Sequence, residues 1–121
     1  MQIRSSAEDY LETILLLSKK TGAVRSIDIV DQMGFSKPSV SVAMKKLREN
    51  NLIHMDEDGY ITLTEDGETA AAQIYERHSV LYDFLVSIGV SQKQAAADAC
   101  RIEHVLSEDT FLAIKKLSEK N

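Results

Sequence analysis

The sequence has little of what several classes of protein require. Its 121 residues include one cysteine and one proline, and none of its apolar runs approaches the roughly 18 residues that span a bilayer. A single cysteine excludes an internal disulfide, and residues 1–5 lack the apolar core of a secretory signal. We therefore expect a cytoplasmic protein with no membrane partner. The length also excludes a typical α/β enzyme.

The residues that are present are typical of an ordered globular protein. Apolar residues make up 44% of the chain and charged residues 27%. The net charge of −5 is unevenly distributed, because residues 1–50 carry eight lysines and arginines against six acids, whereas residues 51–121 carry six against thirteen. This asymmetry suggests a mildly basic half that faces nucleic acid and an acidic half that binds cations.

A helix-turn-helix is predicted in the first half of the chain. Apolar residues at helical spacing indicate helices over 6–20, 26–33 and 36–47. Gly34 provides the turn between the second and third helices, and Pro38 fits the first turn of the third helix, where its missing N–H is no loss. A short helix, a turn with glycine and a second helix are typical of this motif.

A hairpin and three helices follow. Two β-prone runs, 52–55 and 60–63, flank Asp58 and Gly59, and Asp-Gly is a strong hairpin signal. A hairpin directly after a helix-turn-helix is the two-stranded wing of a winged helix. Apolar spacing then predicts a long helix over 64–88 and two shorter helices after it. The predicted N-caps are Ser6, Ser26, Ser36, Thr64, Ser91 and Ser107.

The predicted fold class is mainly α, with two domains. We expect residues 1–63 to form a winged helix-turn-helix domain and residues 64–121 to form a second, helical domain. Apolar residues of the last three helices are candidates for an interface between two copies of the chain: Leu81, Phe84, Leu85, Leu106, Phe111 and Leu112.

The exposed side of the third helix has the chemistry of a DNA contact. Small hydroxyls near a helix N-terminus let the backbone approach phosphates and base edges, and Val42 can touch a thymine methyl. Lys45, Lys46 and Arg48 would bind phosphates. The alternative is a solvated charged face on an ordinary helical domain. The candidate DNA-binding residues are Arg25, Ser26, Ser36, Lys37, Pro38, Ser39, Ser41, Val42, Lys45 and Lys46.

A second set of residues has the chemistry of a metal site. Cys100, Glu103 and His104 would share one helix face, because positions i, i+3 and i+4 are neighbours. A thiolate, a carboxylate and an imidazole that converge in this way form half of a transition-metal site. Taken singly, a cysteine or histidine on an apolar face is more often part of the core. The candidates for the other half are Asp9, Glu12 and His78.

Five motifs along the chain occur together in one known family, in the same order and spacing. They are Glu8–Glu12, Ser36–Ser41, Leu63–Gly67, Arg77–His78 and Ile102–His104. On these motifs the chain resembles the diphtheria toxin repressor family, in particular its manganese-transport-regulator branch. The resemblance implies a homodimeric winged-helix repressor that binds a divalent metal and then a palindromic operator, with no small organic substrate. It also implies the short form, without the SH3-like domain of the longer iron-type members.

The resemblance assigns metal ligands by position: Asp9, Glu12, His78, Glu103 and His104. At Cys100 the chain departs from the manganese branch, which has glutamate there, and matches the iron branch. At Asp9 the chain matches the manganese branch and departs from the iron branch. Because cysteine is a softer ligand than carboxylate, we expect Fe(II) to be favoured over Mn(II). A thiol in place of a bridging carboxylate leaves open whether one or two metals bind.

The expected function is metal-dependent repression of metal-uptake genes. The main alternative is a winged-helix repressor controlled by a non-metal signal, such as oxidation of Cys100. An enzyme with Cys100 as nucleophile and His104 as base is disfavoured, since both lie on one helix face and no glycine-rich oxyanion loop follows. The basic third helix likewise disfavours a protein-interaction module with no DNA role.

Overall fold

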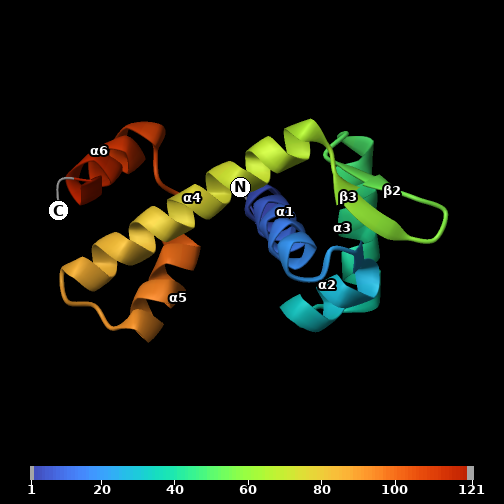
Figure 1. Ribbon diagram of the computed structural model, residues 1–121, viewed down its shortest axis with the longest axis horizontal. Helices are drawn as coiled ribbons and strands as arrows, with labels where there is room; N and C mark the ends of the chain where they lie inside the picture. The colour runs from blue at the N-terminus through green and yellow to red at the C-terminus, as the bar shows by residue number, and fades with distance from the viewer. Residues whose placement is uncertain (1, 120–121) are drawn as a thin grey trace. The chain divides into compact units, whose positions relative to one another are not determined.

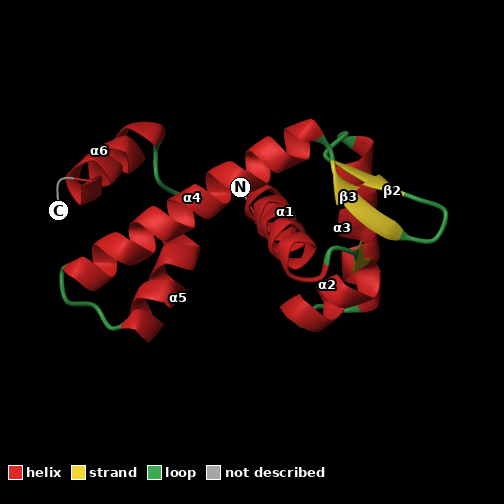
Figure 2. Cartoon of the chain, viewed as in Figure 1, coloured by secondary structure: helices red, strands yellow, loops and turns green. Residues whose placement is uncertain are grey.

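The computed structural model describes the backbone of residues 2–119 and the side chains of residues 7–119. The chain folds into helices and one small antiparallel sheet; Figure 1 labels the helices with β2 and β3, and Figure 2 colours the elements by type. Among the described residues, no helix combines the length and apolar character that crossing a membrane requires. The elements are α1 (Gln2–Thr21), β1 (Val24–Arg25), α2 (Ser26–Met33), α3 (Lys37–Glu49), β2 (Ile53–Met55), β3 (Tyr60–Leu63), α4 (Glu65–Ser87), α5 (Gln92–Ile102) and α6 (Glu108–Glu119).

The predicted mainly α fold with a winged helix-turn-helix is confirmed. The chain divides into two compact units, Met1–Ala72, which we call unit 1, and Gln73–Asn121, which we call unit 2. The helix α4 begins in unit 1 and ends in unit 2.

The core of unit 1 is formed by α1, α2, α3 and the sheet. Ile14, Ile29 and Val40, one from each of the three helices, are completely buried. The turn between α2 and α3 is possible because Gly34 adopts φ +72°, in the left-handed region. Phe35 in this turn meets the Tyr10 ring edge-on, with centroids 5.9 Å apart. These contacts hold the helix-turn-helix on α1.

The wing contains one strand more than the sequence predicted. β2 pairs with β3 as expected, and the Asp56 side chain accepts hydrogen bonds from the backbone N–H groups of Asp58 and Tyr60 in the hairpin turn. β1 adds to the other edge of β3, with Val24 opposite Ile61. The prediction of a two-stranded wing was therefore incomplete, because a two-residue strand gives no alternation pattern in the sequence.

The first turn of α4 packs against the segment that joins α3 to β2. Thr64 caps α4, since its Oγ1 accepts a hydrogen bond from the Gly67 N–H at 3.0 Å. The same hydroxyl donates a hydrogen bond to the Asn51 carbonyl at 2.7 Å. The Thr64 N–H donates to the Leu52 carbonyl at 3.0 Å. A Cβ at Gly67 would overlap that same Leu52 carbonyl oxygen, so glycine is required here for close approach.

Unit 2 consists of the second part of α4 with α5 and α6. Gly89, at φ +104°, turns the chain after α4, and α5 then folds back (Figure 1). Ala95 and Ala99 of α5 are completely buried, so that small residues let this helix pack closely. Leu81 and Phe111, predicted for a dimer interface, are only 2% and 3% exposed within one chain. That part of the prediction was wrong, because both side chains fill the core of the monomer.

Most of the predicted helix starts are confirmed. The hydroxyl oxygens of Ser36, Ser91 and Ser107 accept hydrogen bonds from the backbone N–H three residues later, at 3.2, 3.2 and 3.1 Å. The predicted caps at Ser6 and Ser26 were wrong. α1 already begins at Gln2, and Ser26 is the first residue of α2, after an extended Arg25 at the N-cap.

Candidate metal centre and nucleic-acid interface

Unit 2 encloses a carboxylate between two imidazoles. Glu103, at the C-cap of α5, is 0% exposed. The Nδ1 atom of His78, from α4, lies 3.2 Å from Glu103 Oε2, and the Nε2 atom of His104 lies 3.5 Å from Glu103 Oε1. A carboxylate is costly to bury unless positive charge or hydrogen-bond donors compensate it. The three side chains therefore form a polar cluster around a buried carboxylate in unit 2.

The chemistry of this cluster fits a divalent transition metal. Two imidazole nitrogens and carboxylate oxygens are a usual donor set for iron, manganese and zinc in proteins. Within the described part of the chain, His78 Nδ1 is buried and makes no hydrogen bond of proper geometry, although it faces the carboxylate. A nitrogen and an oxygen that face each other in this way both offer lone pairs to a cation.

The helix that carries Cys100 ends earlier than predicted, because Glu103 and His104 were both expected to lie on it. α5 ends at Ile102, and Glu103 keeps helical dihedral angles at the C-cap, while His104 lies in the turn that follows. The predicted helix face is therefore correct for Cys100 and Glu103 but not for His104. Cys100 lies one turn before Glu103 and is exposed.

The other two candidate ligands, Asp9 and Glu12, belong to unit 1. They lie three residues apart on α1, which places them on one face of that helix, and both are half-buried. Thr13 Oγ1 donates a hydrogen bond to the Asp9 carbonyl at 2.8 Å. The structure thus brings His78, Glu103 and His104 together in unit 2, with Cys100 in the same unit and the two α1 acids in unit 1.

The predicted DNA-reading face is exposed along α3. Apart from the half-buried Ser26, all of the candidate DNA-binding residues are exposed, and Val42 has 55% of its surface accessible. The opposite face of α3 is buried through Val40, Met44 and Leu47. An exposed helix with hydroxyls near its N-terminus and basic residues toward its C-terminus has the form of a recognition helix.

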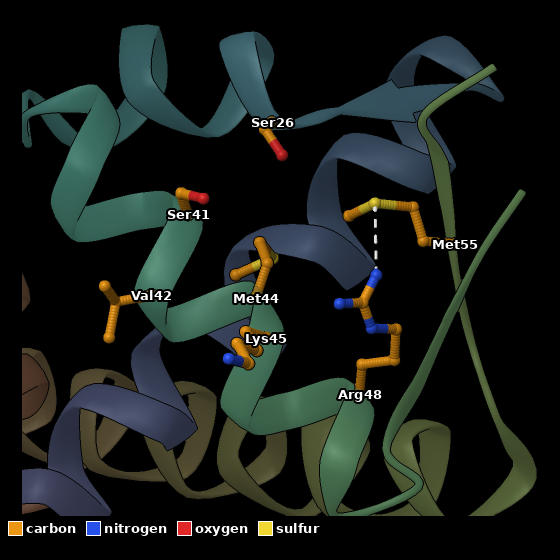
Figure 3. A pocket seen from close by; sticks show the side chains of 7 residues that line it. All are labelled: Ser26, Ser41, Val42, Met44, Lys45, Arg48 and Met55. Atoms are coloured by element: carbon orange, nitrogen blue, oxygen red, sulfur yellow. Dashed lines mark hydrogen bonds between the residues drawn. The ribbon is translucent and has the colours of Figure 1, made fainter. Parts of the chain in front are cut away.

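A hollow of about 260 Å³ lies on this face, between the start of α2, α3 and β2 (Figure 3). Arg48 Nη1 donates a hydrogen bond to Met55 Sδ at 3.9 Å, which turns the guanidinium toward β2. The sequence did not indicate that Met55 lines this hollow, because a methionine in a β-prone run is normally expected in the core. The lining residues are Ser26, Ser41, Val42, Met44, Lys45, Arg48 and Met55.

Arg25 contacts the wing. Its Nη2 atom donates a hydrogen bond to the Asp58 carbonyl at 2.8 Å, and its guanidinium carbon lies 5.2 Å from the centre of the Tyr60 ring. The Arg25 N–H donates to Asp28 Oδ2 at 2.8 Å. This residue therefore joins the hairpin turn to the start of α2, a role that its position in the sequence did not reveal.

A winged helix together with a buried carboxylate–imidazole cluster defines a class of metal-dependent transcriptional regulators. The chain belongs to the iron-dependent repressor family. Residues 2–64 match the model of the N-terminal DNA-binding domain of that family, and residues 64–120 match the model of its metal-binding and dimerisation domain.

Relatives named for both manganese and iron are similar to this chain. Transcriptional regulator MntR of Escherichia coli O157:H7 is 35% identical over 118 residues, which cover 98% of this chain and 76% of that protein. Iron-dependent repressor IdeR of Mycobacterium tuberculosis strain H37Rv is 30% identical over 117 residues, or 96% of this chain and 51% of that protein. A solved manganese-dependent transcriptional repressor in complex with manganese gives a TM-score of 0.86 at 28% identity, over 93% of this chain and 52% of that one. The chain thus spans about half the length of the latter two proteins.

Proposed function

We propose that this protein represses metal-uptake genes when Fe(II), in preference to Mn(II), is bound. The observation that carries the proposal is the enclosed Glu103 carboxylate between His78 and His104, in the same chain as a winged helix. The similar proteins leave the choice of metal open, since one solved repressor is named as manganese-dependent and IdeR as iron-dependent. The preference for iron depends on the thiol of Cys100, one helical turn from Glu103.

The proposed ligand set has six members. His78, Cys100, Glu103 and His104 come from unit 2, and the family resemblance adds the two acids of α1, Asp9 and Glu12. Functionally, we place the boundary at 63/64, with DNA binding before it and metal binding and dimerisation after it.

A shared ligand set would couple metal binding to DNA binding. Carboxylates that share a ligand set repel one another when no cation is bound, which disfavours the DNA-binding arrangement. A cation that needs all of these donors binds that arrangement more tightly and raises its population. In a homodimer, the two recognition helices would then be held for successive major grooves of a palindromic operator, about 34 Å apart.

Cobalt(II) is the probe for the thiol ligand. We expect an anaerobic titration of the purified protein to give a thiolate-to-metal charge-transfer band that saturates at a defined stoichiometry. Cys100→Ser should lose this band while its ligand-field bands remain, because the imidazoles and carboxylates still coordinate. The measurement is absorption in the near-ultraviolet and visible ranges.

Three other results would change the proposal. Cobalt binding without the charge-transfer band would remove Cys100 from the site and favour manganese. An absence of binding would contradict the metal-dependent function altogether. Release from DNA by peroxide, with no dependence on metal, would favour control by oxidation of Cys100 instead.

The basic residues of α3 give a second prediction. Lys45→Ala/Lys46→Ala should weaken operator binding and reduce the slope of log Kd against log salt by about 2, since each lost phosphate contact reduces it by about 1. Fluorescence anisotropy with labelled operator over a range of salt concentrations measures both quantities. The matched control is Lys93→Ala/Lys116→Ala, which removes the same charge from unit 2. An equal change of slope in the control would show a general effect of net charge.

A further inference from the structure

We infer that Arg77 is a positioning residue for the metal centre, because its guanidinium fixes the main chain of the segment that carries Glu103 and His104. This inference depends on the proposed function, since it concerns the same site. Arg77 precedes His78 on α4, so two successive residues of one helix would hold Glu103. His78 faces its side chain, and Arg77 binds its main chain.

The Arg77 side chain makes four contacts with the corner between α5 and α6. Nη1 donates to the carbonyl of Glu103 at 3.1 Å and to the carbonyl of Leu106 at 2.9 Å. Nη2 donates to Glu108 Oε2 at 3.1 Å, and the guanidinium carbon lies 5.2 Å from the centre of the Phe111 ring. The guanidinium therefore spans the chain from the end of α5 to the first turns of α6.

These contacts satisfy groups that helix ends leave open. The last carbonyls of α5 have no partner within that helix, and a cation is favourable at a helix C-terminus. Glu108, in the first turn of α6, is favourable at a helix N-terminus and receives the other nitrogen of Arg77. The Arg77 side chain is only 17% exposed, so water competes little with its hydrogen bonds to the two carbonyls, whereas its bond to the exposed Glu108 is open to water.

The set of contacts that Arg77 makes requires an arginine side chain. A planar guanidinium can direct several N–H groups at fixed angles, whereas the lysine ammonium is a compact charge on a flexible stem. Lysine at this position would keep the positive charge but would not reach two carbonyls, a carboxylate and a ring at once. The conservative variant Arg77→Lys therefore separates the effect of the positive charge from the effect of the guanidinium geometry.

A second α4–α6 contact in the described chain provides the control. Lys115 Nζ donates to Glu76 Oε2 at 3.1 Å, and this hydrogen bond raises the pKa of Lys115. It joins α4 to α6, as Arg77 does, but no described contact of Lys115 involves the carbonyls of Glu103 or Leu106. A loss of helix packing alone would therefore affect Lys115→Ala and Arg77→Lys in the same way.

The test is an anaerobic cobalt(II) titration of the full chain with Arg77→Lys, Arg77→Ala and Lys115→Ala. Loss of residues that orient metal ligands weakens metal binding by about 10- to 100-fold. We expect a loss of that size in Arg77→Lys, together with a change in the intensity of the ligand-field bands. Lys115→Ala should keep the wild-type Kd and spectrum, even where circular dichroism shows a lower Tm for the metal-free protein.

The possible outcomes distinguish this inference from the proposed function. Should Arg77→Lys bind cobalt with wild-type affinity and spectrum, the positioning role is wrong and the metal centre stands. Should Lys115→Ala lose as much affinity as Arg77→Lys, the effect comes from helix packing and the inference is again wrong. A wild-type protein that binds no cobalt would overturn both. Arg77→Lys keeps the test valid if Arg77→Ala does not fold.

Discussion

Glu103→Gln should abolish metal-dependent DNA binding and leave the metal-free fold intact. The substitution keeps the shape of the side chain but removes the negative charge and one ligand oxygen from a completely buried position. We expect metal affinity to fall by at least about 100-fold, because loss of a residue that only orients a ligand already costs about 10- to 100-fold. Isothermal titration with Mn(II) and Fe(II), and operator binding with and without metal, measure the effect.

The stability of the Glu103→Gln variant should change in the opposite direction to its metal affinity. An enclosed carboxylate costs desolvation free energy, so the metal-free variant should unfold at the wild-type temperature or above it. The wild-type protein should gain about 2.7 kcal/mol at a metal concentration of 100 times its Kd, and the variant should gain no more than about 0.4 kcal/mol at that concentration. Glu119→Gln, an exposed charge change in the same unit, should behave as wild type. A variant that still responds fully to metal would exclude Glu103 as a ligand.

The helix-turn-helix was predictable because its signals are local. Ser36, Pro38 and Gly34 define the start of α3 and the turn before it through backbone requirements that involve only neighbouring residues. The buried face of α3 follows from a 3.6-residue period, which any short window shows. The hairpin was predictable for the same reason, since Asp-Gly fits the turn that links two antiparallel strands.

Features that depend on distant partners were not predictable. β1 exists only because β3, more than 30 residues later, offers it a free edge. Leu81 and Phe111 were expected at the dimer interface, yet they are buried in unit 2, because an apolar side chain does not show in the sequence which partner covers it. Arg25 is in the same category, since its partners Asp58 and Tyr60 lie on the wing.

The candidate metal site was predictable in its residue types but not in its supports. The donor atoms of His78, Glu103 and His104 have recognisable chemistry, and family motifs surround them. Arg77 acts on main-chain carbonyls, and any residue type at positions 103 and 106 supplies a carbonyl. A contact of that kind leaves no pattern in the sequence. The end of α5 at Ile102 was also missed, because the Arg77 contact with the Glu103 carbonyl just after it leaves no sequence pattern.

Gly67→Ala should destabilise unit 1, although alanine is the better helix former. Alanine in a helix interior is favoured over glycine by about 1 kcal/mol. Here the added Cβ overlaps the Leu52 carbonyl oxygen, and this carbonyl is held by a hydrogen bond from the Thr64 N–H at 3.0 Å. Overpacking costs about 1 to 3 kcal/mol, and a backbone group cannot move aside as a side chain does. The overlap should therefore outweigh the helix preference, which urea unfolding followed by circular dichroism measures.

The loss of stability should be confined to position 67. Glu68→Ala, one residue later on an exposed site, should change stability by no more than about 0.5 kcal/mol. Because the displaced Leu52 directly precedes β2, Gly67→Ala should also weaken operator binding through the wing. A Gly67→Ala protein as stable as wild type would show that the first turn of α4 tolerates a side chain, and that the close approach to Leu52 is not what requires glycine. Loss of stability with normal operator affinity would instead separate the packing of this turn from the position of the wing.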